Sequence, residues 1–252
     1  MTFFQADGLS IHFGGIKAVD NVNFSVDKGE IFTIIGTNGA GKTTIFNLVS
    51  RIYEPTMGRL VFQDQDITKV PAHQVASLGI ARTFQNIELF EHASVLHNLL
   101  IGRHCHRKSN LLSEILFLPS TKRHELDHRE KVEEVIDFLD LAAYRDQMIA
   151  NLPYGVRKVV ELGRALCIQP SLLLLDEPSS GLNVEETQDM AFWIEDIKND
   201  LGITVLMVEH DMSLVSQVSD RVLALNYGRV LAEGSPREVQ ENPEVIRAYL
   251  GG

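Results

Sequence analysis

The stretch GTNGAGKT at residues 36–43 decides the fold of this chain. Its spacing is G-x-x-x-x-G-K-[ST], in which the glycines let the backbone turn tightly so that successive N–H groups point at phosphate oxygens. The mostly apolar residues 30–35 before it are typical of a buried strand, and apolar positions between residues 45 and 52 recur with a helical period. A glycine-rich turn that matched the spacing by chance would not be expected to have a strand before it and a helix after it. The stretch therefore predicts a phosphate-binding loop between a strand and a helix.

The loop also indicates which ligand groups it would hold. Lys42 is expected to bridge the β- and γ-phosphates of ATP, and the Thr43 hydroxyl is expected to bind Mg²⁺. The helix that follows adds the positive end of its dipole. The expected nucleotide-contacting residues of the loop are Gly36, Thr37, Asn38, Gly39, Ala40, Gly41, Lys42, Thr43 and Thr44.

A second motif, LLLLDEP at residues 172–178, places two acids after a buried strand. The carboxyl ends of parallel strands are where ligands bind, and the leucines argue against a merely solvated strand end. We expect Asp176 to hold Mg²⁺ through a water and Glu177 to polarise the attacking water as a general base.

His210 follows another apolar strand, at residues 203–208. A histidine taken alone is more often structural or solvated than catalytic. Because this one ends a strand of the same predicted sheet, we expect it to reach the γ-phosphate and the attacking water.

Composition narrows the class of protein. The net charge is -11 over 252 residues, which disfavours nonspecific attraction to nucleic acid. The N-terminal residues lack the pattern of a signal peptide, and no apolar run has the length of a membrane span. Cys105 and Cys167 form no metal or redox motif, so we expect unlinked thiols in a reducing cytoplasm.

The remaining patterns predict one α/β domain over residues 1–252. Its expected parts are a mostly parallel sheet, an N-terminal antiparallel β portion, a helical subdomain at about 86–160 and a C-terminal segment at about 226–252. Strand signals fade between residues 86 and 151, where Val132, Val135, Ile136 and Leu139 lie on one face of a helix. Strands are expected at 9–13, 22–26, 30–35, 172–175, 203–208, 222–225 and 229–232.

Taken in order, the motifs make the chain resemble an ABC transporter ATPase, the P-loop fold with an inserted helical subdomain. The resemblance implies that Gln85, in ARTFQ, is the Q-loop residue that contacts Mg²⁺ and senses the membrane subunit. It implies that Phe13 stacks on adenine and that His210 is the H-loop histidine. The matching D-loop residues are Ser179, Ser180, Gly181, Leu182 and Asn183, and the matching signature residues are Leu152, Pro153, Tyr154, Gly155 and Val156.

The tail AEGSP at residues 232–236, the RTFQ and EHDM segments and the insert at 103–128 are similar to the ATPases of branched-chain amino-acid importers. That resemblance implies a second ATPase subunit, identical or different, two membrane permease subunits and a secreted solute-binding protein. The chain would lie on the cytoplasmic face of the membrane, held by its partners. Urea, aromatic-acid and lipopolysaccharide systems stay open, as does a low-activity regulatory subunit. A non-transport ABC ATPase of DNA repair or translation is disfavoured, because the sequence has neither a long coiled-coil insert nor a second ATPase half.

The signature departs from the usual Leu-Ser-Gly-Gly-Gln of the family. Pro153 replaces the serine and Val156 replaces the glutamine, so one hydroxyl donor is missing, although amides of a helix expected at 157–167 remain. We hypothesise that this signature completes a weaker composite site in the partner.

Two histidine patterns suggest metal sites. HELDH at residues 124–128 fits a zinc protease motif, but charged neighbours indicate a solvated helix, and His104-Cys105-His106 is better explained as a basic exposed turn. The apolar run within residues 111–118 is expected to pack inside the insert.

Overall fold

The computed structural model describes residues 2–106 and 119–250. The chain forms two compact units, one of Met1–Gln85 with Ser171–Gly252 and the other of Asn86–Pro170. The helical unit thus extends to Pro170, beyond the boundary expected near residue 160. The apolar run at 111–118 lies outside the described residues.

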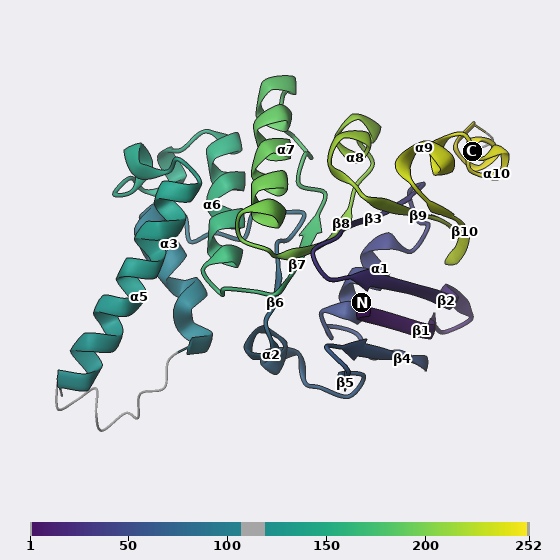
Figure 1. The fold of residues 1–252 in the computed structure, drawn as a ribbon, viewed down its shortest axis with the longest axis horizontal. Helices are drawn as coiled ribbons and strands as arrows, with labels where there is room; N and C mark the ends of the chain where they lie inside the picture. The colour runs from purple at the N-terminus through teal and green to yellow at the C-terminus, as the bar shows by residue number, and fades with distance from the viewer. Residues whose placement is uncertain (1, 107–118, 251–252) are drawn as a thin grey trace. The chain divides into compact units, whose positions relative to one another are not determined.

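The first unit is built on a six-stranded sheet with the order β10-β9-β3-β8-β7-β6 (Figure 1). Its pairs β9–β3, β3–β8, β8–β7 and β7–β6 are parallel, and β10 is antiparallel to β9. The predicted mostly parallel α/β core is confirmed. The strands are β3 (Ile31–Gly36), β6 (Ile80–Arg82), β7 (Leu172–Asp176), β8 (Thr204–Val208), β9 (Arg221–Asn226) and β10 (Arg229–Gly234).

Helices cover both faces of this sheet, which is why every residue of β3, β7 and β8 is buried. Successive residues of a strand point to opposite faces. Ile34 accordingly packs in the cluster that contains Phe46 of α1, whereas Ile35 packs with Val215 of α8 and Val239 of α9. The helices of this unit are α1 (Lys42–Val49), α2 (Ala72–Val75), α7 (Val184–Asn199), α8 (Met212–Val218), α9 (Pro236–Gln240) and α10 (Pro243–Leu250).

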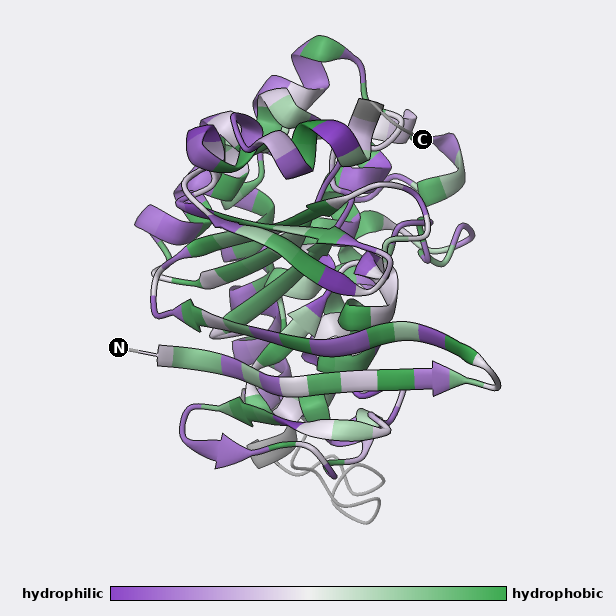
Figure 2. Ribbon diagram, turned by 90° about the vertical axis from the view of Figure 1, so that its right-hand side faces the viewer, coloured by the Kyte–Doolittle hydropathy of each residue, from purple (hydrophilic) through white to green (hydrophobic). Residues whose placement is uncertain are grey.

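A four-stranded sheet with the order β2-β1-β4-β5 joins the same core and is antiparallel. Apolar and polar residues alternate along its long strands (Figure 2), as expected of a sheet with one face on the core. The predicted strands 9–13 and 22–26 are parts of β1 and β2, whereas β4, β5 and β6 were not predicted. Strands β5 and β6 have only two and three residues, and β4 ends in consecutive apolar residues rather than alternating ones, so none of the three has a periodic signal. The strands are β1 (Thr2–Phe13), β2 (Ile16–Asp27), β4 (Met57–Phe62) and β5 (Gln65–Asp66).

The second unit contains α3 (Val95–Gly102), α5 (Pro119–Phe138) and α6 (Tyr154–Leu166). A Cβ on Gly102 would lie 2.4 Å from the carbonyl oxygen of Arg164, so glycine permits the close approach of α3 to α6. Helix α6 begins at Tyr154, and the start expected at residue 157 is wrong. Pro153 is the N-cap residue, and the weak helix formers Gly155 and Val156 had masked the first turn.

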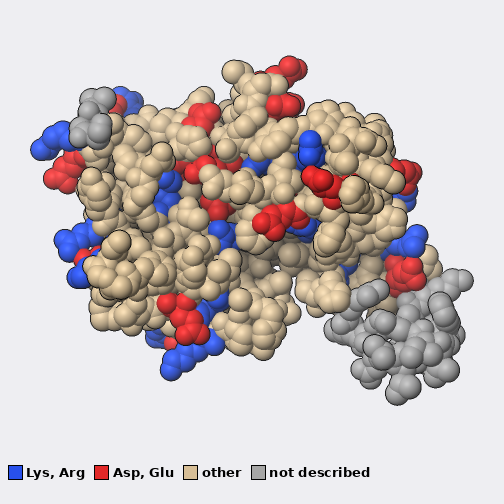
Figure 3. All heavy atoms as spheres, turned by 180° about the vertical axis from the view of Figure 1, so that it is seen from behind, with Lys and Arg blue, Asp and Glu red and all other residues tan. Residues whose placement is uncertain are grey.

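No helix in the described ranges has the length and apolarity needed to cross a membrane. On the face drawn in Figure 3, acidic and basic side chains lie among one another. Surface ion pairs of the chain include Arg229 with Asp20 and Arg237 with Glu241.

Candidate functional site

Two glycines hold the phosphate loop against its neighbours. Gly41, directly before α1, has a φ of 101°, which favours glycine. A Cβ there would lie 2.6 Å from the carbonyl oxygen of Ala18, and a Cβ on Gly36 would lie 2.6 Å from that of Leu225. The loop therefore leaves β3 and enters α1 along a path that tolerates no side chain at either position.

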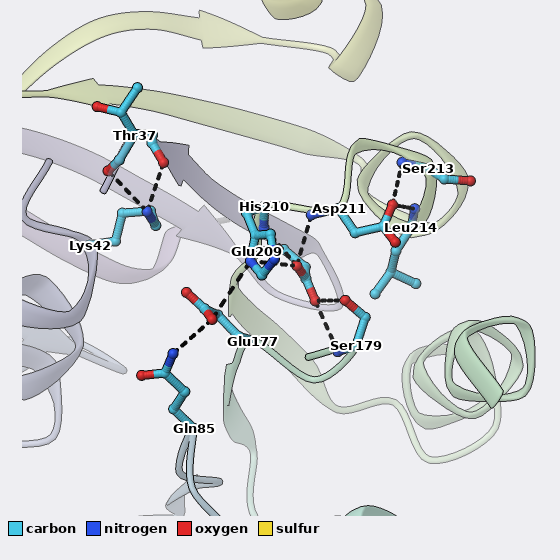
Figure 4. A network of polar contacts seen from close by, with 11 residues as sticks. Thr37, Lys42, Gln85, Glu177, Ser179, Glu209, His210, Asp211, Ser213 and Leu214 are labelled. Atoms are coloured by element: carbon cyan, nitrogen blue, oxygen red, sulfur yellow. Dashed lines mark hydrogen bonds and ion pairs between the residues drawn. The ribbon is translucent and has the colours of Figure 1, made fainter. Parts of the chain in front are cut away.

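Lys42 is the cation of the loop and is almost fully buried, with 6% of its surface exposed. Its Nζ donates hydrogen bonds to the carbonyl oxygens of Gly36, at 2.7 Å, and of Thr37, at 3.2 Å (Figure 4). Burial lowers the pKa of Lys42, and the negative charge of Glu177 opposes that shift. A desolvated ammonium that donates to two carbonyl oxygens would gain strongly from an anionic ligand such as phosphate.

A cavity of about 260 Å³ brings most of the predicted loop residues together with three residues from elsewhere in the same unit, Ala18, Gln85 and Glu177. Thr37 instead lines a neighbouring cavity with Asn226 and Tyr227. The residues lining the first cavity are Ala18, Asn38, Gly39, Ala40, Gly41, Lys42, Thr43, Thr44, Gln85 and Glu177.

Phe13 does not line that cavity. It is 47% exposed at the end of β1, and its ring meets the ring of Tyr53 edge-on with 5.3 Å between centroids. No sequence pattern pointed to Tyr53, because the residue follows α1 in a turn without periodicity. The pair presents an exposed aromatic surface that a planar base could stack on.

Asp176 ends β7 and is only 2% exposed. Its Oδ2 accepts a hydrogen bond from Nη2 of Arg82 at 2.7 Å, and its backbone N–H donates to the Thr83 hydroxyl. Its other oxygen, Oδ1, is buried and has no hydrogen-bond partner within the described part of the chain. Such a carboxylate has one oxygen committed to the protein and one left over for a ligand.

Arg82 is a site residue that the sequence did not reveal. Its guanidinium also donates to Asn47 of α1 and to Ser50, the C-cap residue of that helix, and lies 5.5 Å from the ring centroid of Phe46. Strand β6, helix α1 and the end of β7 are thereby tied together at one cation. The sequence feature that could have indicated its role is an arginine placed among mostly apolar residues, three positions before Gln85.

Glu177, Gln85 and His210 meet at one carboxylate oxygen. Oε2 of Glu177 accepts a hydrogen bond from Nε2 of Gln85 at 2.9 Å and lies 3.6 Å from Nδ1 of His210 (Figure 4). Glu177 has a φ of 48°, a strained conformation for a residue with a side chain, and its N–H donates to Val208. The turn after β7 thus aims the second acid toward the turn after β8.

Glu209, next to His210, is fully buried, although no sequence pattern suggested a role for it. Its Oε1 accepts from the N–H and the hydroxyl of Ser179, and its Oε2 accepts from the N–H groups of His210 and Asp211. The buried carboxylate therefore links the predicted D-loop to the predicted H-loop.

The rest of the predicted D-loop leads into α7. Gly181 takes a φ of 81°, and Asn183 caps the helix in a reciprocal arrangement with Glu186. Ser180 and Leu182 are partly exposed between them.

The predicted signature residues lie in the second unit. Leu152 is buried, and Pro153 provides no side-chain hydrogen bond at the N-cap of α6. Tyr154, Gly155 and Val156 form the first turn of α6, although the side chain at the cap is apolar. The positive end of the helix dipole lies at this turn.

The two histidine patterns form no cluster of metal ligands within the described ranges. His128 accepts a hydrogen bond from Arg103, and burial, with a contribution from that charge, lowers its pKa. The turn at residues 103–106 is less exposed than expected, because the buried Arg103 guanidinium binds the carbonyl oxygen of Cys167.

Comparison with known proteins agrees with this geometry. The family model described as ABC transporter matches residues 19–180, and the one described as branched-chain amino acid ATP-binding cassette transporter matches residues 229–252. The chain is 40% identical to the high-affinity branched-chain amino acid transport ATP-binding protein LivG of Escherichia coli K12, over 98% of this chain and 97% of LivG. It is 37% identical to the corresponding protein BraF of Pseudomonas aeruginosa, with the same coverage.

Two solved structures share the fold over 100% of both chains. One is a nucleotide-free ATP-binding cassette from an ABC transporter, with a TM-score of 0.87 and 31% identity. The other is the ADP conformation of an ATP-binding cassette of an ABC transporter, with a TM-score of 0.87 and 30% identity. The family match over more than half of the chain and the identity along nearly its whole length show that this protein belongs to the ABC transporter family, as an ATP-binding and ATP-hydrolysing subunit.

Proposed function

We propose that this chain powers an importer whose solute is a branched-chain amino acid. The observation that carries the catalytic part is the meeting of Gln85, Glu177 and His210 at one carboxylate oxygen beside the glycine loop. The choice of solute is supported by the near full-length identity to LivG and BraF and by the match of the C-terminal residues.

The roles of the residues follow from their positions. Lys42 would neutralise the β- and γ-phosphates, and Phe13 would stack on adenine. Glu177 would accept a proton from the water that attacks the γ-phosphorus, while the bond from that phosphorus to the bridging oxygen breaks and ADP leaves. His210 and Gln85 would hold the water and the γ-phosphate in line with that carboxylate.

The residues also fit a Mg²⁺ ion. Oδ1 of Asp176 is a buried carboxylate oxygen without a hydrogen-bond partner within the described residues, and Mg²⁺ prefers such oxygen ligands. The Thr43 hydroxyl and the side-chain oxygen of Gln85 would complete the protein's contribution. The ion would neutralise charge on the β- and γ-phosphate oxygens.

ATP would be sandwiched between this subunit and a second ATPase subunit, identical or different. Each subunit would offer its signature, here Leu152 to Val156, to the nucleotide on its partner's loop, with the D-loop residues Ser179 to Asn183 at the same interface. Two membrane permease subunits would hold the chain at the inner face of the membrane, and a secreted solute-binding protein would deliver the solute. The proposal includes no nucleic-acid partner.

A Glu177→Gln variant tests the catalytic proposal. Removal of a general base lowers turnover by about 10²- to 10⁴-fold, whereas ATP affinity should stay within about threefold. Glu185→Gln changes the same side chain at an exposed position on α7 and should leave turnover unchanged. Unchanged turnover in Glu177→Gln would remove the assignment.

The solute is tested separately, in proteoliposomes containing the complete transporter and its binding protein. Leucine, isoleucine or valine should stimulate ATP turnover, and urea or an aromatic acid should not. Stimulation by urea or an aromatic acid alone would point to the related importers. A second candidate, a low-activity regulatory subunit, is favoured by the missing hydroxyl at Pro153 and would show ATP binding with turnover unaffected by any solute.

A further inference from the structure

The buried carboxylate of Glu209 lies between two turns of the site (Figure 4). Oε1 accepts from the N–H of Ser179 at 3.0 Å and from its hydroxyl at 2.5 Å. Oε2 accepts from the N–H of His210 at 2.6 Å and from that of Asp211 at 3.0 Å. Each oxygen therefore serves one turn, and all four groups act as donors toward it.

This bridge sets the backbone on both sides of the catalytic contact. Ser179 is two residues after Glu177, and His210 directly follows Glu209. The side chains of Glu177 and His210 approach to 3.6 Å in the turns that follow β7 and β8. Any change in the separation of the two turns would therefore change the distance between these two side chains.

Stability alone is a weak reason to bury this group. Burying a carboxylate is costly, and a turn can be held by a neutral or exposed side chain, as Asn183 does at α7. An ionised carboxylate is acceptor-only on both oxygens, whereas an amide accepts on one side and donates on the other. Only the carboxylate can accept from both turns at once.

We propose that Glu209 is a positioning residue for hydrolysis, which holds His210 in register with Glu177 by tying its turn to Ser179. The inference rests on the proposed catalytic roles of Glu177 and His210. Glu209 itself would not touch the nucleotide, so its effect would pass through His210.

A double-mutant cycle with His210→Ala tests the proposal by single-turnover hydrolysis of radiolabelled ATP. Glu209→Gln places an amide donor against N–H donors, and the resulting displacement of His210 should slow hydrolysis by about 100-fold while ATP affinity changes less than about threefold. In the His210→Ala background, Glu209→Gln should change the rate by less than about threefold. Equal slowing in both backgrounds would overturn the proposal.

Glu238→Gln is the matched control. Glu238 also accepts from the N–H and the hydroxyl of a serine, Ser235, at 2.8 Å each, but it caps α9. This variant should hydrolyse ATP at the wild-type rate. If Glu209→Gln does not fold, Ser179→Ala can be used in its place, because it removes only the hydroxyl bond to Glu209. It should slow ATP hydrolysis less than Glu209→Gln, and the slowing should again disappear in the His210→Ala background.

NMR of the His210 imidazole supplies a readout that does not require turnover. Glu209→Gln should shift the ring resonances of His210, and Glu238→Gln should leave them in place. Unshifted His210 resonances in Glu209→Gln would overturn the positioning role of Glu209, even if the variant still hydrolyses ATP. A failure of the proposed catalytic function is recognised separately, because it would appear as unchanged ATP turnover in Glu177→Gln.

Discussion

Replacing Arg82 by methionine would leave the Asp176 carboxylate buried without its counter-charge. Asp176 is 2% exposed, its Oδ2 is 2.7 Å from the guanidinium, and its Oδ1 already has no hydrogen-bond partner within the described residues. Removal of one partner from a buried ion pair costs about 3–5 kcal/mol. Loss of the bonds to Asn47 and Ser50 acts in the same direction, so we expect the free energy of unfolding to fall by about 4 kcal/mol.

Arg59 and Asp66 provide a matched control on the surface. Their charged atoms are 2.9 Å apart, but the side chains are 56% and 49% exposed. Exposed pairs contribute about 0–1 kcal/mol, so Arg59→Met should have a correspondingly small effect. The two variants remove the same kind of pair at a similar distance, and they differ in burial.

Urea unfolding followed by circular dichroism measures both variants, with equal m-values as the sign that the unfolding transitions are comparable. Adding Asp176→Asn to the Arg82→Met variant removes the unpaired charge and should recover part of the lost stability. The reasoning is refuted if Arg82→Met costs no more than Arg59→Met, or if the asparagine recovers nothing.

Three further perturbations address the loop, the signature and a buried thiol. Gly41→Ala places a Cβ 2.6 Å from a carbonyl oxygen and should abolish ATP binding measured by calorimetry, whereas Gly15→Ala, with open space around it, should bind normally. Restoring the missing groups by Pro153→Ser with Val156→Gln should raise ATP turnover by about 10- to 150-fold if one charge-assisted hydrogen bond is regained; no rise would reject the weak-signature hypothesis. Burial raises the pKa of the Cys167 thiol to about 12, so the folded state keeps a proton that the unfolded state loses above a pKa of about 8.5. The Cys167 thiol should therefore lower stability in urea by about 1.4 kcal/mol per pH unit between these values, and the slope in Cys167→Ala should be smaller by that amount; equal slopes in the two proteins would contradict this assignment.

The site residues that could be predicted from the sequence are those that lie in motifs of a few consecutive residues. Lys42 is defined by glycine spacing between a strand and a helix, and Asp176 and Glu177 by a run of leucines before them. These signals depend on neighbouring residues, because glycine conformation and strand burial are properties of short segments. The same reasoning could predict that His210 ends a core strand.

Arg82 and Glu209 show what local patterns leave out. Arg82 binds Asp176 across 94 positions of the chain, and Glu209 binds Ser179 across 30. Neither partner can be read from spacing, because a charged residue within or just after a short strand is as consistent with exposure to solvent as with a buried contact. Helix α6 illustrates the same limit at its start, where weak helix formers hid a turn that the N-cap conformation permits.

The sequence by itself determined the fold class, the phosphate loop and the acids that end β7, because each depends on conformational preferences and burial over a few consecutive residues. Only the tertiary structure decided which side chains meet. Parallel register places Asp176 of β7 beside Val208 of β8 and Arg82 of β6 beside Leu174 of β7. That register, and the turns that follow it, bring Glu177, His210 and Glu209 together, because side chains at the ends of adjacent strands are neighbours in space whatever their separation along the chain.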